Sequence, residues 1–117
     1  MGNRANINVR DNKQDHGVYL YTHWGGSQLP ILLQETLNKK ERWDDTPYLT
    51  RMIFSTMIKY DINGTTGYGI STYLTDNENP LIYVYIDKQT ITINDESFTF
   101  NEYICLTTDE IYEIYNR

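Results

Sequence analysis

The chain is organised around the stretch Val-Tyr-Leu-Tyr-Thr-His-Trp-Gly-Gly at residues 18–26. The first six side chains alternate between small or aliphatic ones (Val, Leu, Thr) and ring-bearing ones (Tyr, Tyr, His), which is the period of a half-buried strand. Gly25 and Gly26 then end the strand, because glycine allows backbone angles that other residues resist. The stretch therefore predicts a rigid strand that carries His23 and Trp24 at its tip, beside uncovered backbone.

Periodic segments on both sides of this stretch predict the element order ββ-αα-ββββ-α. We expect strands over residues 3–10, 18–23, 69–75, 81–87, 90–94 and 97–100, main helices over 28–40 and 47–60, and a short C-terminal helix opened by a capping box at Thr107 and Glu110. The short link between the first two strands favours antiparallel pairing, and the last four strands resemble a meander. Residues 101–106 fit no element clearly.

These elements predict one α+β domain over residues 1–117. Its antiparallel sheet has about five or six strands, and the two main helices pack on one face, because only they are long enough to cover it. The strand at 81–87 is apolar on both faces and is expected at the centre of the sheet. The core shared by the helices is expected to contain Leu33, Leu37, Met52, Ile53 and Met57.

Composition excludes several classes of protein. The net charge of −6 and the pI of 4.7 argue against a general nucleic-acid binder, which needs a basic surface. The single Cys105 excludes an internal disulfide and a CxxC-type zinc site. No apolar run reaches the roughly 20 residues of a membrane span, and the polar N-terminus does not fit a signal peptide. We therefore expect a protein of the bacterial cytoplasm with no membrane contact.

Four segments resemble a group of small bacterial and phage proteins to which no activity is assigned. They are Met-Gly-Asn-Arg-Ala at 1–5, Tyr-Leu-Tyr-Thr-His-Trp-Gly-Gly at 19–26, Arg-Trp-Asp-Asp at 42–45 and Thr-Gly-Tyr-Gly-Ile-Ser-Thr at 66–72. The resemblance spans most of the chain and implies no particular chemistry. The phage members suggest an anti-defence role as a hypothesis.

Candidate binding residues gather where the predicted strands end. Antiparallel pairing of the first two strands brings Arg4 close to His23 and Trp24, and the N–H groups at the start of the following helix favour an anion. The predicted site contains Arg4, His23, Trp24, Gly25, Gly26, Ser27, Trp43, Thr66, Gly67, Tyr68 and Gly69. Planar rings and positive charge in one concavity predict an anionic, nucleotide-like small molecule, bound without a metal or cofactor.

Two other classes of function stay open. An enzyme would use His23 with Asp44 or Asp45, but no nucleophile motif accompanies them. The position of both carboxylates favours a simpler role, in which they cap the N-terminus of the second helix and complement its dipole. An acidic interaction protein could instead occlude a basic effector, although its acidic residues are scattered along the chain.

Self-association is a further expectation. The tyrosines at 19, 21, 83 and 85 share strand faces that two helices on the other side leave uncovered. Large exposed apolar patches usually mark interfaces, so this face predicts a homodimer.

Overall fold

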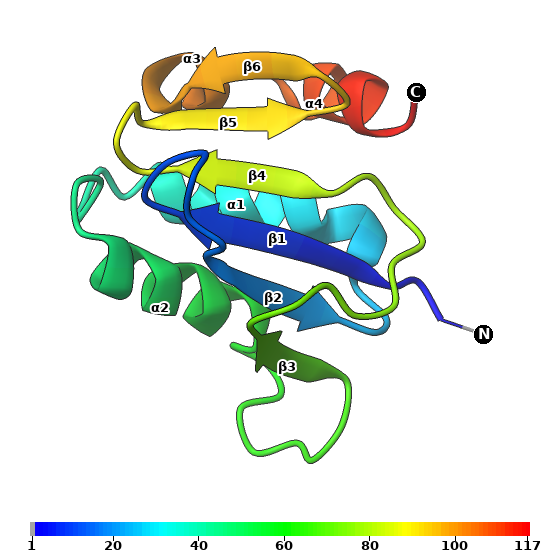
Figure 1. Ribbon diagram of the computed structural model, residues 1–117. Coiled ribbons are helices and arrows are strands. Elements are labelled where there is room, and N and C mark those ends of the chain that lie inside the picture. The colour runs from blue at the N-terminus through cyan, green and yellow to red at the C-terminus, as the bar shows by residue number, and fades with distance from the viewer. Residues whose placement is uncertain (1) are drawn as a thin grey trace.

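Residues 2–117 are described in a computed structural model, and they fold into one sheet with helices on one side (Figure 1). The elements in chain order are β1 (Ala5–Arg10), β2 (Val18–Thr22), a 3-10 turn η1 (Gly26–Gln28), α1 (Leu29–Leu37), α2 (Thr46–Met57), β3 (Tyr68–Ser71), β4 (Ile82–Tyr85), β5 (Thr90–Ile93), β6 (Glu96–Thr99), α3 (Phe100–Ile104) and α4 (Thr108–Tyr115). The predicted α+β class and the order ββ-αα-ββββ-α are confirmed. Residues 101–104 of the unassigned segment form the additional helix α3, which begins at Phe100, the residue predicted to end the last strand.

The sheet has six strands in the order β3-β2-β1-β4-β5-β6 and is mixed rather than antiparallel. Strands β1 and β2 pair antiparallel as predicted, whereas β1 and β4 pair parallel, with Ile7 opposite Ile82. The predicted meander is wrong at its first link, because β3 pairs with β2 at the edge of the sheet. The chain must then cross back over residues 72–81 before β4 can pair at the centre. A tight polar turn at 76–80 suggested a hairpin, and the sequence carries no signal for this crossing.

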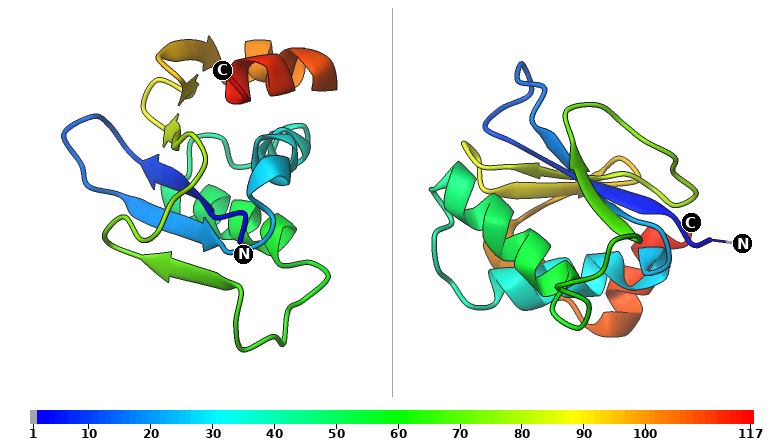
Figure 2. Two further views of the ribbon diagram at one scale, coloured as in Figure 1. Left: turned by 90° about the vertical axis from the view of Figure 1, so that its right-hand side faces the viewer. Right: turned by 90° about the horizontal axis from the view of Figure 1, so that it is seen from below.

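All four α-helices lie on the same face of the sheet (Figure 2). Helix α2 begins as predicted, with the Asp45 side chain accepting from the Tyr48 amide at 3.1 Å and Pro47 in the first turn. Of the five expected core residues, four are buried and Met52 is only half-buried. The two helices also share a buried hydrogen bond of 2.8 Å between the hydroxyls of Thr36 and Thr56.

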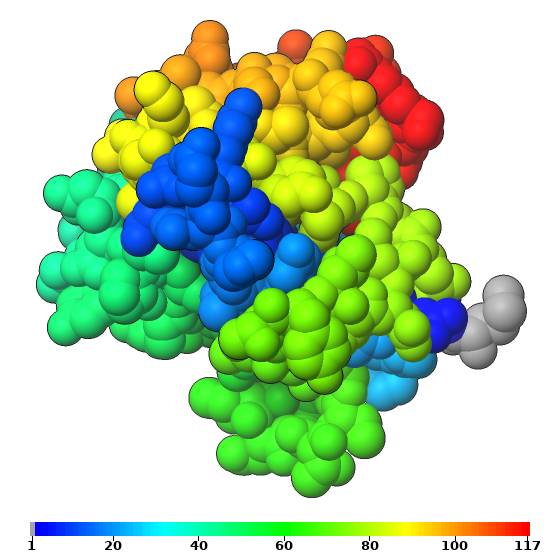
Figure 3. All heavy atoms as spheres, in the orientation of Figure 1, coloured from blue at the N-terminus to red at the C-terminus, as the bar shows by residue number. Residues whose placement is uncertain are grey.

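The opposite face of the sheet is partly covered by the chain itself. Asn6 and Asn8 of β1 are fully buried there, and the connection between β3 and β4 runs across the front of the molecule (Figures 1 and 3). The rings of Tyr83 and Tyr85 stack on each other at 6.0 Å, and the Arg10 guanidinium lies 5.5 Å from the Tyr83 ring. This face is therefore less open than the tyrosine pattern suggests.

The C-terminal helices begin at two capping boxes. Thr99 and Glu102 open α3, and Thr107 and Glu110 open α4, the second box as predicted. No helix within residues 2–117 has the length and apolar character needed to cross a membrane.

Candidate functional site

The loop after β2 meets the loop before β3, as the sequence predicts. We call the contact between residues 23–25 and residues 66–68 the junction. The His23 amide donates to the Gly67 carbonyl at 2.8 Å, which extends the pairing of Thr22 with Tyr68. The Trp24 ring lies against Gly67, where an added Cβ would be 2.4 Å from its Cζ3 atom and where φ is +96°. Both the close ring and the left-handed backbone require glycine at this position. Trp24 itself is 54% exposed.

His23 is held by aromatic neighbours. Its Nδ1 atom lies 3.0 Å from the Tyr21 hydroxyl, two residues away on the same strand face. Its ring packs edge-to-face on Trp24 at 4.9 Å. The carboxylates considered for an enzyme lie elsewhere: Asp45 caps α2, whose Thr46 hydroxyl bonds Asp11 in the β1–β2 turn, at the opposite end of β2 from His23. The arrangement needed for a His–Asp pair is therefore not formed.

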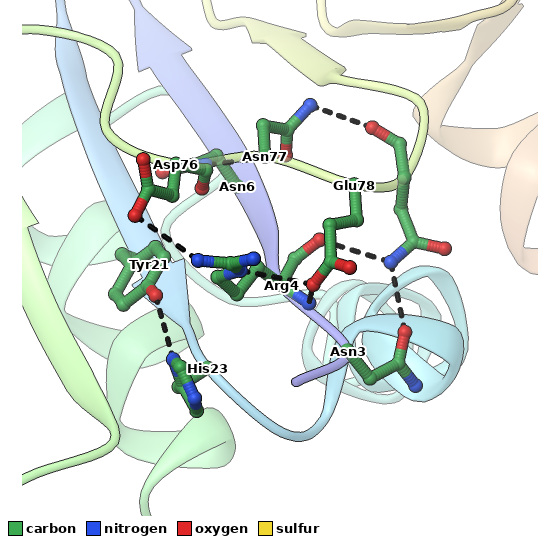
Figure 4. A network of polar contacts seen from close by, with 9 residues as sticks. Asn3, Arg4, Asn6, Tyr21, His23, Asp76, Asn77 and Glu78 are labelled. Carbon is green, nitrogen blue, oxygen red and sulfur yellow. Dashed lines mark hydrogen bonds and ion pairs between the residues drawn. The ribbon is translucent and has the colours of Figure 1, made fainter. Parts of the chain in front are cut away.

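Arg4 is neutralised by two carboxylates (Figure 4). Its Nε atom donates to Glu78 Oε1 at 2.9 Å, and its Nη1 atom lies 3.1 Å from Asp76 Oδ2. The same Glu78 oxygen accepts from the Arg4 backbone amide at 3.0 Å. Hydrogen bonding and attraction to Glu78 raise the pKa of Arg4, and the bonds from Arg4 lower the pKa of Glu78. The predicted cation is thus already paired within the chain.

The amides after Trp24 are also used internally. The Gly25 N–H donates to Thr22 Oγ1 at 3.1 Å, and the Gly26 N–H donates to the Asn3 carbonyl at 2.8 Å. Ser27 Oγ accepts from the Asn3 side-chain amide at 2.9 Å. Gly26 is buried, and a Cβ there would lie 2.3 Å from the Asn3 carbonyl oxygen. These groups close the N-terminal segment onto the loop and leave no free pair of glycine amides for an anion.

Of the three remaining predicted residues, Trp43 lies elsewhere, whereas Thr66 and Gly69 lie on either side of Gly67 and Tyr68. Trp43 lies outside the junction: its Nε1 donates to the Leu37 carbonyl at 3.1 Å and its ring packs on Phe100 at 5.4 Å. Trp43 therefore belongs to the packing between α1 and α3, because it bonds the last residue of α1 and its ring contacts the first residue of α3. Thr66 is exposed before β3, and Gly69 lies within β3. No group of three His, Cys, Asp or Glu side chains within residues 2–117 could hold a metal ion.

Two hollows lie along α2. A small cavity of about 130 Å³ behind the junction is bordered by Thr22, Tyr68 and Lys59, and Lys59 already pairs with Glu35 at 2.7 Å. A larger groove of about 570 Å³ separates the β1–β2 hairpin from α2. We call it the hairpin groove. It is lined by Val9, Arg10, Asp11, Asp15, His16, Gly17, Val18, Thr46, Pro47, Thr50, Arg51, Phe54 and Ile70.

Sequence reasoning missed the hairpin groove. The available signal was the width of the apolar surface on α2, where Phe54 lies beside the expected core stripe. A helix with more apolar surface than its sheet covers leaves part of that surface facing water.

Comparisons with protein-family models, curated proteins and solved structures find no match. The resemblance to the bacterial and phage group stays a prediction. The geometry of the hairpin groove and of the junction is what supports a functional proposal.

Proposed function

We propose that this protein binds a small amphipathic molecule in the hairpin groove, with an apolar body and an acidic head group. The observation that carries the proposal is the groove itself, about 570 Å³ in volume and walled by apolar side chains with two arginines among its polar residues. Typical small-molecule sites have about 300–1,000 Å³, mostly apolar walls and a few polar groups that orient the ligand. The proposed ligand is anionic, like the ligand predicted from the sequence, but the proposed site is the hairpin groove instead of the junction.

The apolar body is proposed from three side chains. Val18 and Phe54 are half-buried, and Ile70 is 60% exposed, so a good part of this apolar wall faces water. Removing apolar surface from water is favourable by about 25 cal/mol per Å². A hydrocarbon or aromatic body placed between these side chains would therefore supply most of the binding free energy.

The acidic head group is proposed from Arg51. Two arginines line the groove, and within residues 2–117 neither has a carboxylate at ion-pair distance. The Arg10 guanidinium donates to the Asn8 side chain and lies over the Tyr83 ring, so Arg51 is the more available of the two. The Arg51 guanidinium contacts the Ser55 hydroxyl at 3.4 Å. A guanidinium offers a fork of donors that suits a carboxylate or sulfonate.

Two fluorescent dyes test the two parts of the proposal. Anilinonaphthalene sulfonate has an aromatic body and an anionic group, and N-phenylnaphthylamine has the same body without the anion. We expect Phe54→Ala to weaken binding of both dyes. Arg51→Gln is expected to weaken only the sulfonate, by about fivefold, because an exposed ion pair contributes up to about 1 kcal/mol.

The matched control is Lys39→Gln, which removes one positive charge from an exposed residue just beyond the C-terminal end of α1. Asp15→Asn is expected to strengthen sulfonate binding, because Asp15 also lines the groove and would repel an anion. Equal effects of Arg51→Gln and Lys39→Gln on the sulfonate would remove the acidic head group from the proposal. Unchanged binding of both dyes to Phe54→Ala would place the ligand outside the groove.

A further inference from the structure

We propose that the protein forms a homodimer in which β3 of one copy pairs antiparallel with β3 of a second copy, around a two-fold axis at Gly69. The two six-stranded sheets would then join into one continuous sheet. This inference rests on the edge strand alone and does not depend on a ligand in the hairpin groove.

Among residues 2–117, no strand pairs with the outer edge of β3, and its register is determined by the neighbouring strand β2. The Gly67 carbonyl accepts from β2, and Gly69 and Ser71 stand opposite Tyr21 and Tyr19. Because antiparallel strands direct alternate residues to opposite sides, the N–H and C=O groups of Tyr68 and Ile70 point away from β2. A two-fold axis at Gly69 pairs each Tyr68 with Ile70 of the second copy, and these residues exchange four hydrogen bonds.

Gly69 has no role in its own chain that requires glycine. A Cβ at this position would meet no atom within 4 Å, and its φ lies outside the left-handed region. Glycine inside a strand weakens the strand and often marks a site where another backbone approaches closely. The two-fold pairing places Gly69 directly opposite Gly69 of the second copy, with Cα atoms about 4.5 Å apart.

The edge also lacks the charges that usually prevent pairing. No charged residue occurs from Thr65 to Thr75, although charged residues make up 22% of the chain. Natural edge strands are commonly protected by lysine, proline or a bulge. Two copies that each carry a net charge of −6 repel each other. Contact through an uncharged edge such as β3 brings no like charges close together.

Exposed apolar side chains surround this edge. Ile70 is 60% exposed, and Tyr73 and Leu74, which follow the strand, are 69% and 47% exposed. The loop before β3 extends past this edge of the sheet (Figure 1), and in the side view it lies toward the helices rather than directly beneath the strand (Figure 2, left). Across a two-fold axis, this neutral and apolar edge would meet an identical edge. A second copy of the chain is therefore the favoured occupant.

The dimer would extend the hairpin groove. Tyr68 and Ile70 share the helix-side face of β3 with Thr22 and Leu20, and Ile70 lines the groove. The proposed register puts Tyr68 of the second copy beside Ile70 on that face. Each groove therefore gains an aromatic side chain from the partner copy.

Charge substitutions at Gly69 test the axis directly. In sedimentation equilibrium at tens of micromolar, the wild type is expected at twice 13.8 kDa, and Gly69→Lys and Gly69→Glu are each expected at 13.8 kDa. Like charges directly opposite on paired strands are destabilising, and opposite charges are favourable. An equimolar mixture of the two variants is therefore expected to restore the dimer. Circular dichroism is expected to be unchanged, because a Cβ at Gly69 meets no atom.

The control is Ile62→Lys, which adds the same charge at an exposed apolar residue in the loop before β3 and is expected to leave the dimer intact. A monomeric wild type, or a dimer that survives in Gly69→Lys, would overturn the proposal. A dimer that Ile62→Lys dissociates, or a mixture of the two Gly69 variants that stays monomeric, would place any interface away from Gly69 and overturn it as well.

Discussion

Two buried tyrosines tie the C-terminal helices to the loop after β2, and their removal is a sharp test of the packing. The Tyr103 hydroxyl donates to the Pro30 carbonyl at 2.7 Å, and the Tyr115 hydroxyl donates to the Gly26 carbonyl at 2.8 Å. Both side chains are fully buried. The Gly26 carbonyl also accepts from the Leu29 amide, so it keeps a partner when Tyr115 becomes Phe. Each Tyr→Phe change is therefore expected to lower the free energy of unfolding by about 1 kcal/mol at pH 7.

The same hydroxyls predict a loss of stability at alkaline pH. Burial raises the pKa of Tyr103 and of Tyr115 above the usual value of 10.0. Because the folded pKa is the higher one, the stabilisation is complete below pH 10 and is lost as the pH rises, when the unfolded state releases protons that the folded state retains. Each tyrosine then costs about 1.4 kcal/mol per pH unit. The stabilities of the wild type and the double Phe variant are expected to cross roughly between pH 10 and 11.

Urea unfolding followed by circular dichroism at pH 7, 9, 10 and 11 measures this crossing. Tyr60→Phe is the control, because Tyr60 is 92% exposed, and its stability is expected to follow that of the wild type at every pH. If the difference between the wild type and the double variant is the same at pH 7 and pH 11, the two hydroxyls are not sealed from water and the reasoning fails.

Two further substitutions test the junction. Gly67→Ala is expected to lower the melting temperature and shift tryptophan emission to the red, because the new Cβ would displace the Trp24 ring from 2.4 Å and φ is +96°. Glu78→Gln is expected to destabilise the protein at pH 7. Because pairing with Arg4 lowers the pKa of Glu78 below 4.5, that stabilisation is lost as the pH falls through the folded-state pKa, and the melting temperatures of variant and wild type should converge in acid.

Local signals in the sequence predict elements that a few neighbouring residues determine. The Asp45 cap with Pro47 and the box formed by Thr107 and Glu110 act within one helical turn, so each could be recognised without the rest of the chain. The pairing of β4 with β1 depends instead on a crossing of the whole sheet. No local pattern distinguishes that crossing from a hairpin, and the sheet was wrongly predicted to be fully antiparallel for this reason.

One part of the candidate site could likewise be predicted from the sequence, and another part depends on the crossing of the sheet. Register alone brings the start of the chain to His23, because β1 and β2 are joined by a short turn. The carboxylates of Asp76 and Glu78 that neutralise Arg4 come from more than 70 residues away. Their arrival depends on the crossing after β3, so the sequence predicted a free cation where the fold makes an ion-pair network.

Gly67 and Gly69 lie two residues apart, but only Gly67 is required by the fold of its own chain. Gly67 has a positive φ and the Trp24 ring against it, so its own fold accounts for it. Gly69 has an ordinary strand conformation and open space where a side chain would lie. Glycine in a strand costs about 0.5–1 kcal/mol relative to alanine, and the proposed pairing of two β3 strands would account for that cost at Gly69. The polar groups around Arg4 bond one another, whereas within residues 2–117 no strand pairs with the edge of β3 that faces away from β2. That edge, and the groove that Ile70 shares with α2, are therefore the surfaces through which this domain is expected to act.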